Sequence, residues 1–295
     1  MSTYRVLAPQ PARAASESVD RSPPSAVALG PLTEDVRETL RTGWIDPAVR
    51  AASTSPMFLT AAWSAIRPNV GRSFAALARA LRQEAADSVS PRPSGDLLRS
   101  LEIELPEGER RRMLDAARAA HMASAKSQMV AHLLHRLARR DRLRGTGSEE
   151  PTARRGVPEW QRWMSFQPIP AGARTVLEDA VTRLGAPAPP PALRLFARWP
   201  AAATRLWQEL VPVLESESWR PKVLRLRNRL AKGIETLPHA VELQWPAVRA
   251  RGVSESERLR LVGLLSAHDA AMPAYTLIAA FAWVAVGAPG IGPEG

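Results

Sequence analysis

The chain has 295 residues, of which 40 are Lys or Arg and 29 are Asp or Glu, so its formal net charge is +11. It contains no cysteine, which excludes disulfides, thiolate metal sites and thiol nucleophiles. Only Lys126, Lys222 and Lys232 are lysines, and the arginines are spread along the whole chain. The charge is therefore a weak indication of a nucleic-acid groove.

The first 30 residues are rich in Pro, Ala and Ser and lack the apolar core of a signal peptide. This composition predicts a disordered lead-in over residues 1–30, with the folded part beginning near Pro31. A cytoplasmic location is compatible with these features and is our expectation.

Apolar residues at spacings of three and four dominate the rest of the chain and predict an all-α fold. Asp46 supplies an N-cap acceptor before Pro47 at a first helical position, and residues 254–257 have a capping-box pattern. No two-residue alternation typical of a strand is evident. The predicted helices span residues 34–41, 57–66, 73–86, 107–139, 173–184, 201–213, 222–236 and 254–286.

An internal repeat is visible at a long offset. The stretch DPAVRAASTSP at 46–56 aligns with residues 190–200 at a constant offset of 144, which also pairs Trp63 with Trp207. The last helices align at an offset of 148. A period this long indicates a duplicated domain rather than a solenoid.

The duplication predicts two tandem helical repeats that pack around a pseudo-twofold axis as an intramolecular pseudo-dimer. We expect repeat 1 over residues 31–138, a linker over 139–165, repeat 2 over 166–288 and a short tail over 289–295.

The apolar segment 270–287 has to be weighed as a membrane span. It is at the short limit for crossing a bilayer of roughly 30 Å, contains Pro273 and aligns with a polar helix of repeat 1. We therefore predict a central buried helix of repeat 2 and no membrane partner.

A basic cluster, HRLARRDRLR, occupies residues 135–144 and continues as a polar segment to residue 155. No aromatic residues interleave its charges, which favours a solvated helix end and interdomain linker over a phosphate-binding patch. Nucleic acid is thus an unlikely partner by this reasoning.

Residues 33–44, 56–68, 72–87 and 197–213, together with the two long repeat helices, resemble the group I DL-2-haloacid dehalogenases. The likeness runs in the same order, with the same duplication, from about residue 31. It implies an all-α pseudo-dimer with the active site between its repeats, usually assembled as a homodimer. It also implies a small organic acid substrate, such as a 2-haloacid, and no metal or organic cofactor.

In that family an aspartate deprotonates a water that attacks the halogen-bearing carbon directly. A base that accepts this proton contributes roughly 10² to 10⁴ in rate. The resemblance places the aspartate seven residues before the Trp199-Pro200 pair, and this position is Ala192. Activity is therefore expected to be altered or lost.

The resemblance also implies a substrate-binding set. Ser124 stands at the position of the family's water-holding asparagine, two residues before the Lys126 anchor. Trp44 matches an aromatic of the substrate cavity, and Pro47 replaces a second aromatic. With Ala192 these residues form the predicted cavity, whose lining would differ from that of the family.

A substitute base can be sought among the remaining polar residues. His121 shares a helix face with Ser124, and its repeat mate is Asp269, so a dyad of His121 and Asp269 could poise a water near the cavity. A structural hydrogen bond at the repeat interface, or a separation too large for contact, are the alternatives. Asp46 is expected to be a helix cap rather than a displaced catalytic acid.

His132 and His135 are three residues apart but lack a carboxylate at matching spacing. We expect one packed and one exposed histidine rather than a metal site. For the carboxylate of a substrate, Arg50, Arg194 and Lys126 are candidate partners, although a helix start could also hold an anion.

Three functional hypotheses remain. The first is a dehalogenase-like enzyme with altered or much weakened chemistry, favoured by Trp44 and the full-length duplication. The second is a non-catalytic relative that binds a small organic acid or serves as a scaffold, favoured by Ala192 and Ser124. The least favoured is a nucleic-acid-binding protein that uses residues 135–155.

Overall fold

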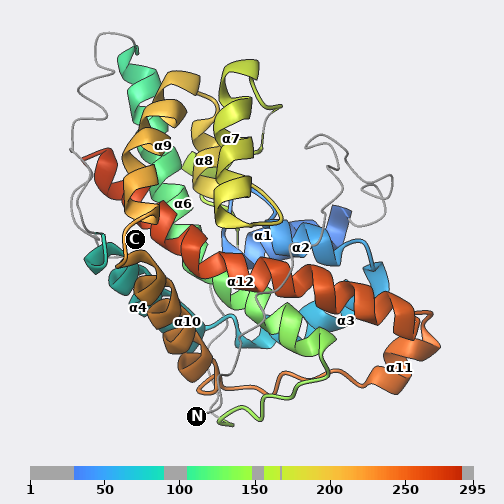
Figure 1. Ribbon diagram of the computed structural model, residues 1–295. Coiled ribbons are helices and arrows are strands. Elements are labelled where there is room, and N and C mark those ends of the chain that lie inside the picture. Colours follow the sequence, from blue (N-terminus) through green and yellow to red (C-terminus); the bar gives the residue numbers. More distant parts are fainter. Residues whose placement is uncertain (1–29, 90–104, 148–155, 167, 288–295) are drawn as a thin grey trace, which may run out of the picture.

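The computed structural model describes residues 30–89, 105–147, 156–166 and 168–287. These residues form eleven α-helices and two 3-10 turns, and the only extended pairing among them is an isolated antiparallel bridge between Leu143 and Val241. The all-α prediction is confirmed (Figure 1). Most of the predicted lead-in and the whole tail lie outside the described residues.

The helices follow the predicted order closely. Those before residue 139 are α1 (Gly30–Leu40), α2 (Pro47–Ala52), α3 (Pro56–Ile66), η1 (Arg67–Asn69), α4 (Arg72–Asp87) and α6 (Glu107–Ala138). Those after it are η2 (Glu159–Gln161), α7 (Ala171–Leu184), α8 (Pro191–Phe196), α9 (Pro200–Leu214), α10 (Trp219–Ile234), α11 (Trp245–Ala250) and α12 (Glu255–Ala285). The six-residue helices α2, α8 and α11 are not among the predicted spans, because six residues are too few to show a helical period. The start of α2 was predicted from Asp46 and Pro47.

The centre of the molecule is the pair of long helices α6 and α12, which run antiparallel (Figure 1). Their direction follows from three contacts along the seam, His121 with Trp283, Gln128 with Thr276, and His132 with Asp269. Residues with increasing numbers along α6 contact residues with decreasing numbers along α12, so the two helices run in opposite directions. Every residue from 271 to 282 is buried, as expected for a central helix. None of the helices described here is long and apolar enough to cross a membrane.

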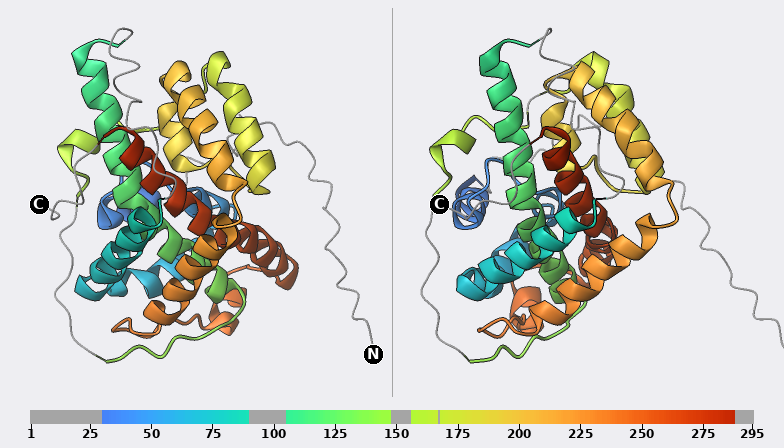
Figure 2. Two further views of the ribbon diagram at one scale, coloured as in Figure 1. Left: turned by 60° about the vertical axis from the view of Figure 1, so that its left-hand side comes forward. Right: turned by 90° about the vertical axis from the view of Figure 1, so that its left-hand side faces the viewer.

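The shorter helices cover this pair. Helices α4 and α10 pack against each other and against α12 (Figure 2). Helices α2 and α8 each contact both α6 and α12. Both begin with a proline at the first helical position, where the missing N–H costs nothing.

One tertiary interaction occurs twice at the predicted offset. The indole Nε1 of Trp63 donates to Asp35 at 2.7 Å, and the indole Nε1 of Trp207 donates to Asp179 at 2.7 Å. Both members of the second pair lie 144 residues after those of the first. Helices α2 and α8 have the same length and the same offset. These correspondences support the predicted duplication.

The two indole bonds should contribute alike. We expect Trp63→Phe and Trp207→Phe each to lower the free energy of unfolding by about 1–2 kcal/mol, because each leaves a partly buried carboxylate without its indole donor. Urea unfolding of both variants, with Trp219→Phe for comparison, measures the effect. A large loss in one variant and none in the other would contradict equivalent roles.

Candidate functional site

Ala192, at the position that the resemblance assigns to a catalytic aspartate, is the second residue of α8. It is 2% exposed, and α8 packs against both central helices. Pro191 fixes the backbone at the helix start, so no neighbouring residue can slip into this position. The start of α8 therefore places a methyl group in the core, at the position where the resemblance implies a carboxylate.

The Ser124 hydroxyl is engaged within its own helix. It donates to the His121 carbonyl at 2.9 Å. Such a bond to the preceding turn competes with any role in holding a water.

Trp44 lies in the connection between α1 and α2 and is 4% exposed. Its ring packs against Phe166 with centroids 5.9 Å apart, and the Arg194 guanidinium lies 5.6 Å from the centre of the Phe166 ring. Phe166 thus links the predicted pocket aromatic to α8. Sequence reasoning missed Phe166, because nothing local indicates that this residue, the first of the predicted repeat 2, packs against both Trp44 and Arg194.

Lys126 and Ser124 are two residues apart and therefore face opposite sides of α6. The Lys126 ammonium donates to the carbonyl of Leu40, the last residue of α1, at 3.1 Å. Pro47 is the half-buried first residue of α2. The predicted substrate-binding residues therefore lie in different surroundings in the structure.

The structure does not bring His121 and Asp269 together, which contradicts the hypothesis of a dyad and agrees with the alternative that the two are too far apart. The ring of His121 stacks on Trp283 at 6.0 Å with an interplanar angle of 1°. Burial, and secondarily the nearby Arg82 guanidinium, lower the pKa of His121 to about 3. His121 is therefore neutral at pH 7 and a poor base.

The reason is the antiparallel crossing of α6 and α12. Repeat mates at an offset of 148 meet only where the helices cross, and there the Thr276 hydroxyl donates to the Gln128 side chain at 2.8 Å. His121 and Asp269 lie seven residues from this point in opposite directions, which separates them by roughly 20 Å along the helices.

Asp269 instead binds two histidines of α6. Its carboxylate lies 3.0 Å from Nδ1 of His132 and 2.9 Å from Nδ1 of His135. Because a carboxylate only accepts, both rings must carry a proton on Nδ1. Burial acts to raise the pKa of Asp269, but the hydrogen bonds and charge of both histidines outweigh it and hold that pKa well below its ordinary value.

The expectation of one packed and one exposed histidine is wrong, because the side chains of His132 and His135 are only 15% and 12% exposed. Sequence reasoning missed their carboxylate because it comes from α12, 134 residues further on. In the described part of the chain, no three His, Cys, Asp or Glu side chains are arranged to hold a metal ion.

Asp46 is the N-cap of α2, as predicted. Its Oδ1 accepts a hydrogen bond from the Ala48 N–H at 2.8 Å. The carboxyl is 5% exposed, and its Oδ2 receives no well-aligned hydrogen bond. Burial raises the pKa of Asp46 to about 6, although the nearby Ser127 hydroxyl and two backbone N–H groups act to lower it.

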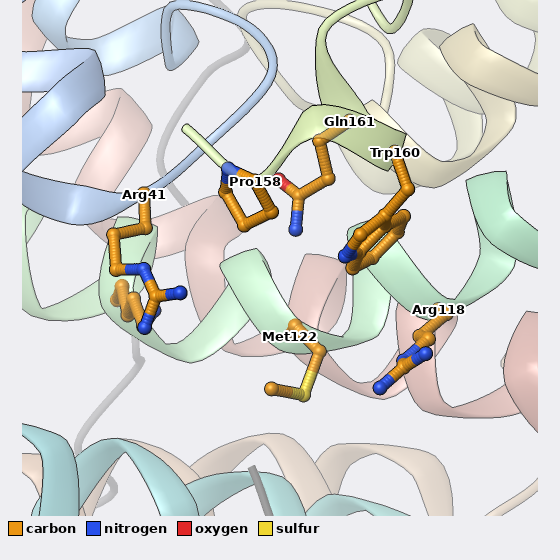
Figure 3. A pocket seen from close by; sticks show the side chains of 7 residues that line it. Arg41, Arg118, Met122, Pro158, Trp160 and Gln161 are labelled. Atoms are coloured by element: carbon orange, nitrogen blue, oxygen red, sulfur yellow. The ribbon is translucent and has the colours of Figure 1, made fainter. Parts of the chain in front are cut away.

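A basic pocket opens between the end of α1, one face of α6 and the η2 segment (Figure 3). Its cavity volume is about 80 Å³. Its lining residues are Arg41, Arg118, Met122, Lys126, Pro158, Trp160 and Gln161. Gly43 lets the η2 segment approach, since a Cβ there would lie 2.5 Å from the Gln161 carbonyl oxygen. Of the predicted site residues, this pocket contains Lys126 alone.

The arginines of the basic cluster contact carboxylates of the second half. Arg136 pairs with Glu235 at 2.7 Å, and Arg140 pairs with Glu255 at 2.6 Å. Arg142 lies 3.4 Å from Glu242. These contacts partly neutralise the cluster within the chain, while residues 148–155 lie outside the described part.

Comparison with solved structures shows which fold this is. A D-2-haloacid dehalogenase in complex with L-LA superposes with a TM-score of 0.77 at 16% identity, covering 88% of this chain and 92% of the other. A D-2-haloacid dehalogenase mutant with D-2-CPA gives 0.74 at 17%, with the same coverage. A further mutant gives 0.76 at 18%, covering 93% and 98%.

The chain therefore has the all-α fold of the D-2-haloacid dehalogenases over nearly its whole described length. No protein-family model matches it, and no curated protein matches it either. At these identities the likeness establishes the fold, and function has to be argued from the site.

Proposed function

We propose that this protein is a dehalogenase-like protein that takes a small organic acid, such as a 2-haloacid, between its two halves, and that its hydrolytic activity is altered or lost. The observation that carries the proposal is the buried methyl group of Ala192 at the start of α8. The fold likeness supports the binding of the acid. Ala192 is the reason to expect that the hydrolytic activity is altered or lost.

Displacement of halide by water needs a group that takes the proton as the new bond forms. Neither residue considered as a substitute is suited to this. Burial lowers the pKa of His121 to about 3, and its ring is stacked on Trp283. The Asp269 carboxylate is engaged by His132 and His135. Without a base, binding of the acid is retained while hydrolysis by direct attack of water is not.

Halide release from both enantiomers of 2-chloropropionate tests the proposal. We expect no release by the wild-type protein. We expect Ala192→Asp to gain release, because this change restores a carboxylate at the start of α8. A matched control is Ala48→Asp, which places a carboxylate at the corresponding position of α2, 144 residues earlier. The control should remain silent.

A binding measurement, made beside the halide-release assay, distinguishes an enzyme from a non-catalytic protein that binds the same acid. Equilibrium dialysis of 2-chloropropionate against the wild-type protein should show binding without turnover. Release by the wild type would contradict the loss of the base. Silence of the Ala192→Asp variant, together with no binding to the wild type, would contradict a retained acid site.

A further inference from the structure

The basic pocket gathers positive charge on one surface. Arg41, Arg118 and Lys126 line it, and no carboxylate residue is part of its lining. Asp115, one turn before Arg118, is the nearest acid along α6. Burial raises the pKa of Asp115, although the charges of Arg111 and Arg118 act to lower it, and Asp115 forms no ion pair with Arg118 among the described residues. A bound anion would compensate the charges of Arg41 and Arg118.

Arg41 adopts a costly backbone conformation. Its φ is +56°, in the left-handed region where the residue after a helix is usually glycine. Thr42 closes the helix end through a hydrogen bond to the Arg37 carbonyl at 3.0 Å. Glycine would adopt this conformation at a lower cost in free energy.

Arg140 provides an internal comparison. It is the other non-glycine residue with positive φ among the described residues, and its guanidinium pairs with Glu255 at 2.6 Å. Arg41 makes no such pair with a described carboxylate. Its Nε is buried and has no hydrogen-bond partner among the described residues. The guanidinium therefore has capacity for an anion.

The cations lie at the two ends of the pocket (Figure 3). Arg41 lies at one end, close to Lys126, whose ammonium reaches the carbonyl of the residue before Arg41. Arg118 lies at the other end over the Trp160 ring, 5.0 Å from its centroid. Arg118 and Lys126 are eight residues apart, or roughly 12 Å along α6.

The middle of the pocket is largely apolar. Met122, Pro158 and Trp160 line it between the cationic ends, with Gln161 beside them (Figure 3). A ligand with one small charged group would leave one cationic end unused. A ligand with an apolar centre and a charged group at each end would match both.

We propose that this pocket is a binding site for a linear organic dicarboxylate, with one carboxylate on Arg41 and Lys126 and the other on Arg118. The site is separate from the start of α8, since neither Ala192 nor Ser124 lines it. The inference does not rest on the proposed dehalogenase-like function. Carboxylate bonds to guanidinium groups are charge-assisted and geometrically specific, so each arginine should contribute strongly.

Calorimetric titration with glutarate, adipate and pimelate tests the site, with hexanoate and inorganic phosphate as the comparison ligands. We expect a dicarboxylate of this series to bind at least about tenfold more tightly than hexanoate, because both cationic ends are used. Arg118→Gln and Arg41→Gly should each weaken that binding by about tenfold or more. Arg111→Gln removes the same charge from an exposed position of α6 and should leave binding unchanged.

Arg41→Gly also reports on the backbone. Glycine removes the left-handed strain, so this variant should unfold at the same or a higher urea concentration while binding more weakly. The proposal is overturned if no dicarboxylate binds, or if hexanoate or phosphate binds as tightly. It is also overturned if Arg118→Gln, whose exposed side chain is not needed for folding, binds as the wild type does.

Discussion

Replacing Asp269 by Ala should destabilise the protein by about 2–4 kcal/mol at pH 7.5, because it leaves the Nδ1–H groups of His132 and His135 without their shared acceptor inside the α6–α12 seam. Urea unfolding measures the loss. Asp269→Asn, which keeps the shape and one acceptor oxygen, should lose less. Asp87→Ala removes an exposed carboxylate and should have little effect.

The stability lost in Asp269→Ala should depend on pH in a direction that follows from the pKa of Asp269. The pKa of Asp269 is lower in the folded protein than its ordinary value of 3.8. Its contribution is therefore fully present above about pH 4–5 and is lost as the pH falls through the folded value. The stability difference between wild type and Asp269→Ala should shrink below pH 4. Equal stability of the two proteins at pH 7.5 would show that the histidine contacts contribute nothing.

Asp46→Asn should stabilise the protein at pH 7.5. The pKa of Asp46 rises from 3.8 to about 6 in the folded state, chiefly through burial. Between these values the folded state binds more protons than the unfolded state, so stability falls as the pH rises and the cost persists above pH 6. An uncharged amide avoids a cost of about 2–3 kcal/mol and can still cap α2 through its oxygen.

Two comparisons separate the charge of Asp46 from its capping role. Asp46→Ala removes both, so it should be less stable than Asp46→Asn at every pH. The advantage of Asp46→Asn over the wild type should largely disappear near pH 4, where the folded wild-type carboxyl is already protonated. An advantage that is independent of pH would show that the charge is not its cause.

Much of the fold could be predicted from the sequence, because helices are specified by contacts between residues three or four apart and by their caps. The pattern placed α1, α4, α6 and α12 to within a few residues, and Asp46-Pro47 marked the start of α2. The offset of 144 residues predicted which tryptophans would correspond, and Trp63 and Trp207 make the same bond. The sequence also shows directly that residue 192, where the resemblance places the family's aspartate, is an alanine.

The candidate sites depended on relations between helices that the sequence does not display. Symmetry alone suggested that His121 and Asp269 would meet, but the crossing point at Gln128 and Thr276 separates them. The same crossing brings Asp269 to His132 and His135. Direction and register between two long helices are set by packing along their whole length, which no local pattern determines.

Burial decided the remaining chemistry. The sequence by itself determined that Asp46 would cap a helix, whereas only the surrounding core raised its pKa to about 6. Likewise the sequence contained Arg41, Arg118 and Trp160 without indicating that they share a pocket. Local propensities thus set the helices and their ends, and the desolvation and proximity that give these side chains their properties arose only when the helices packed together.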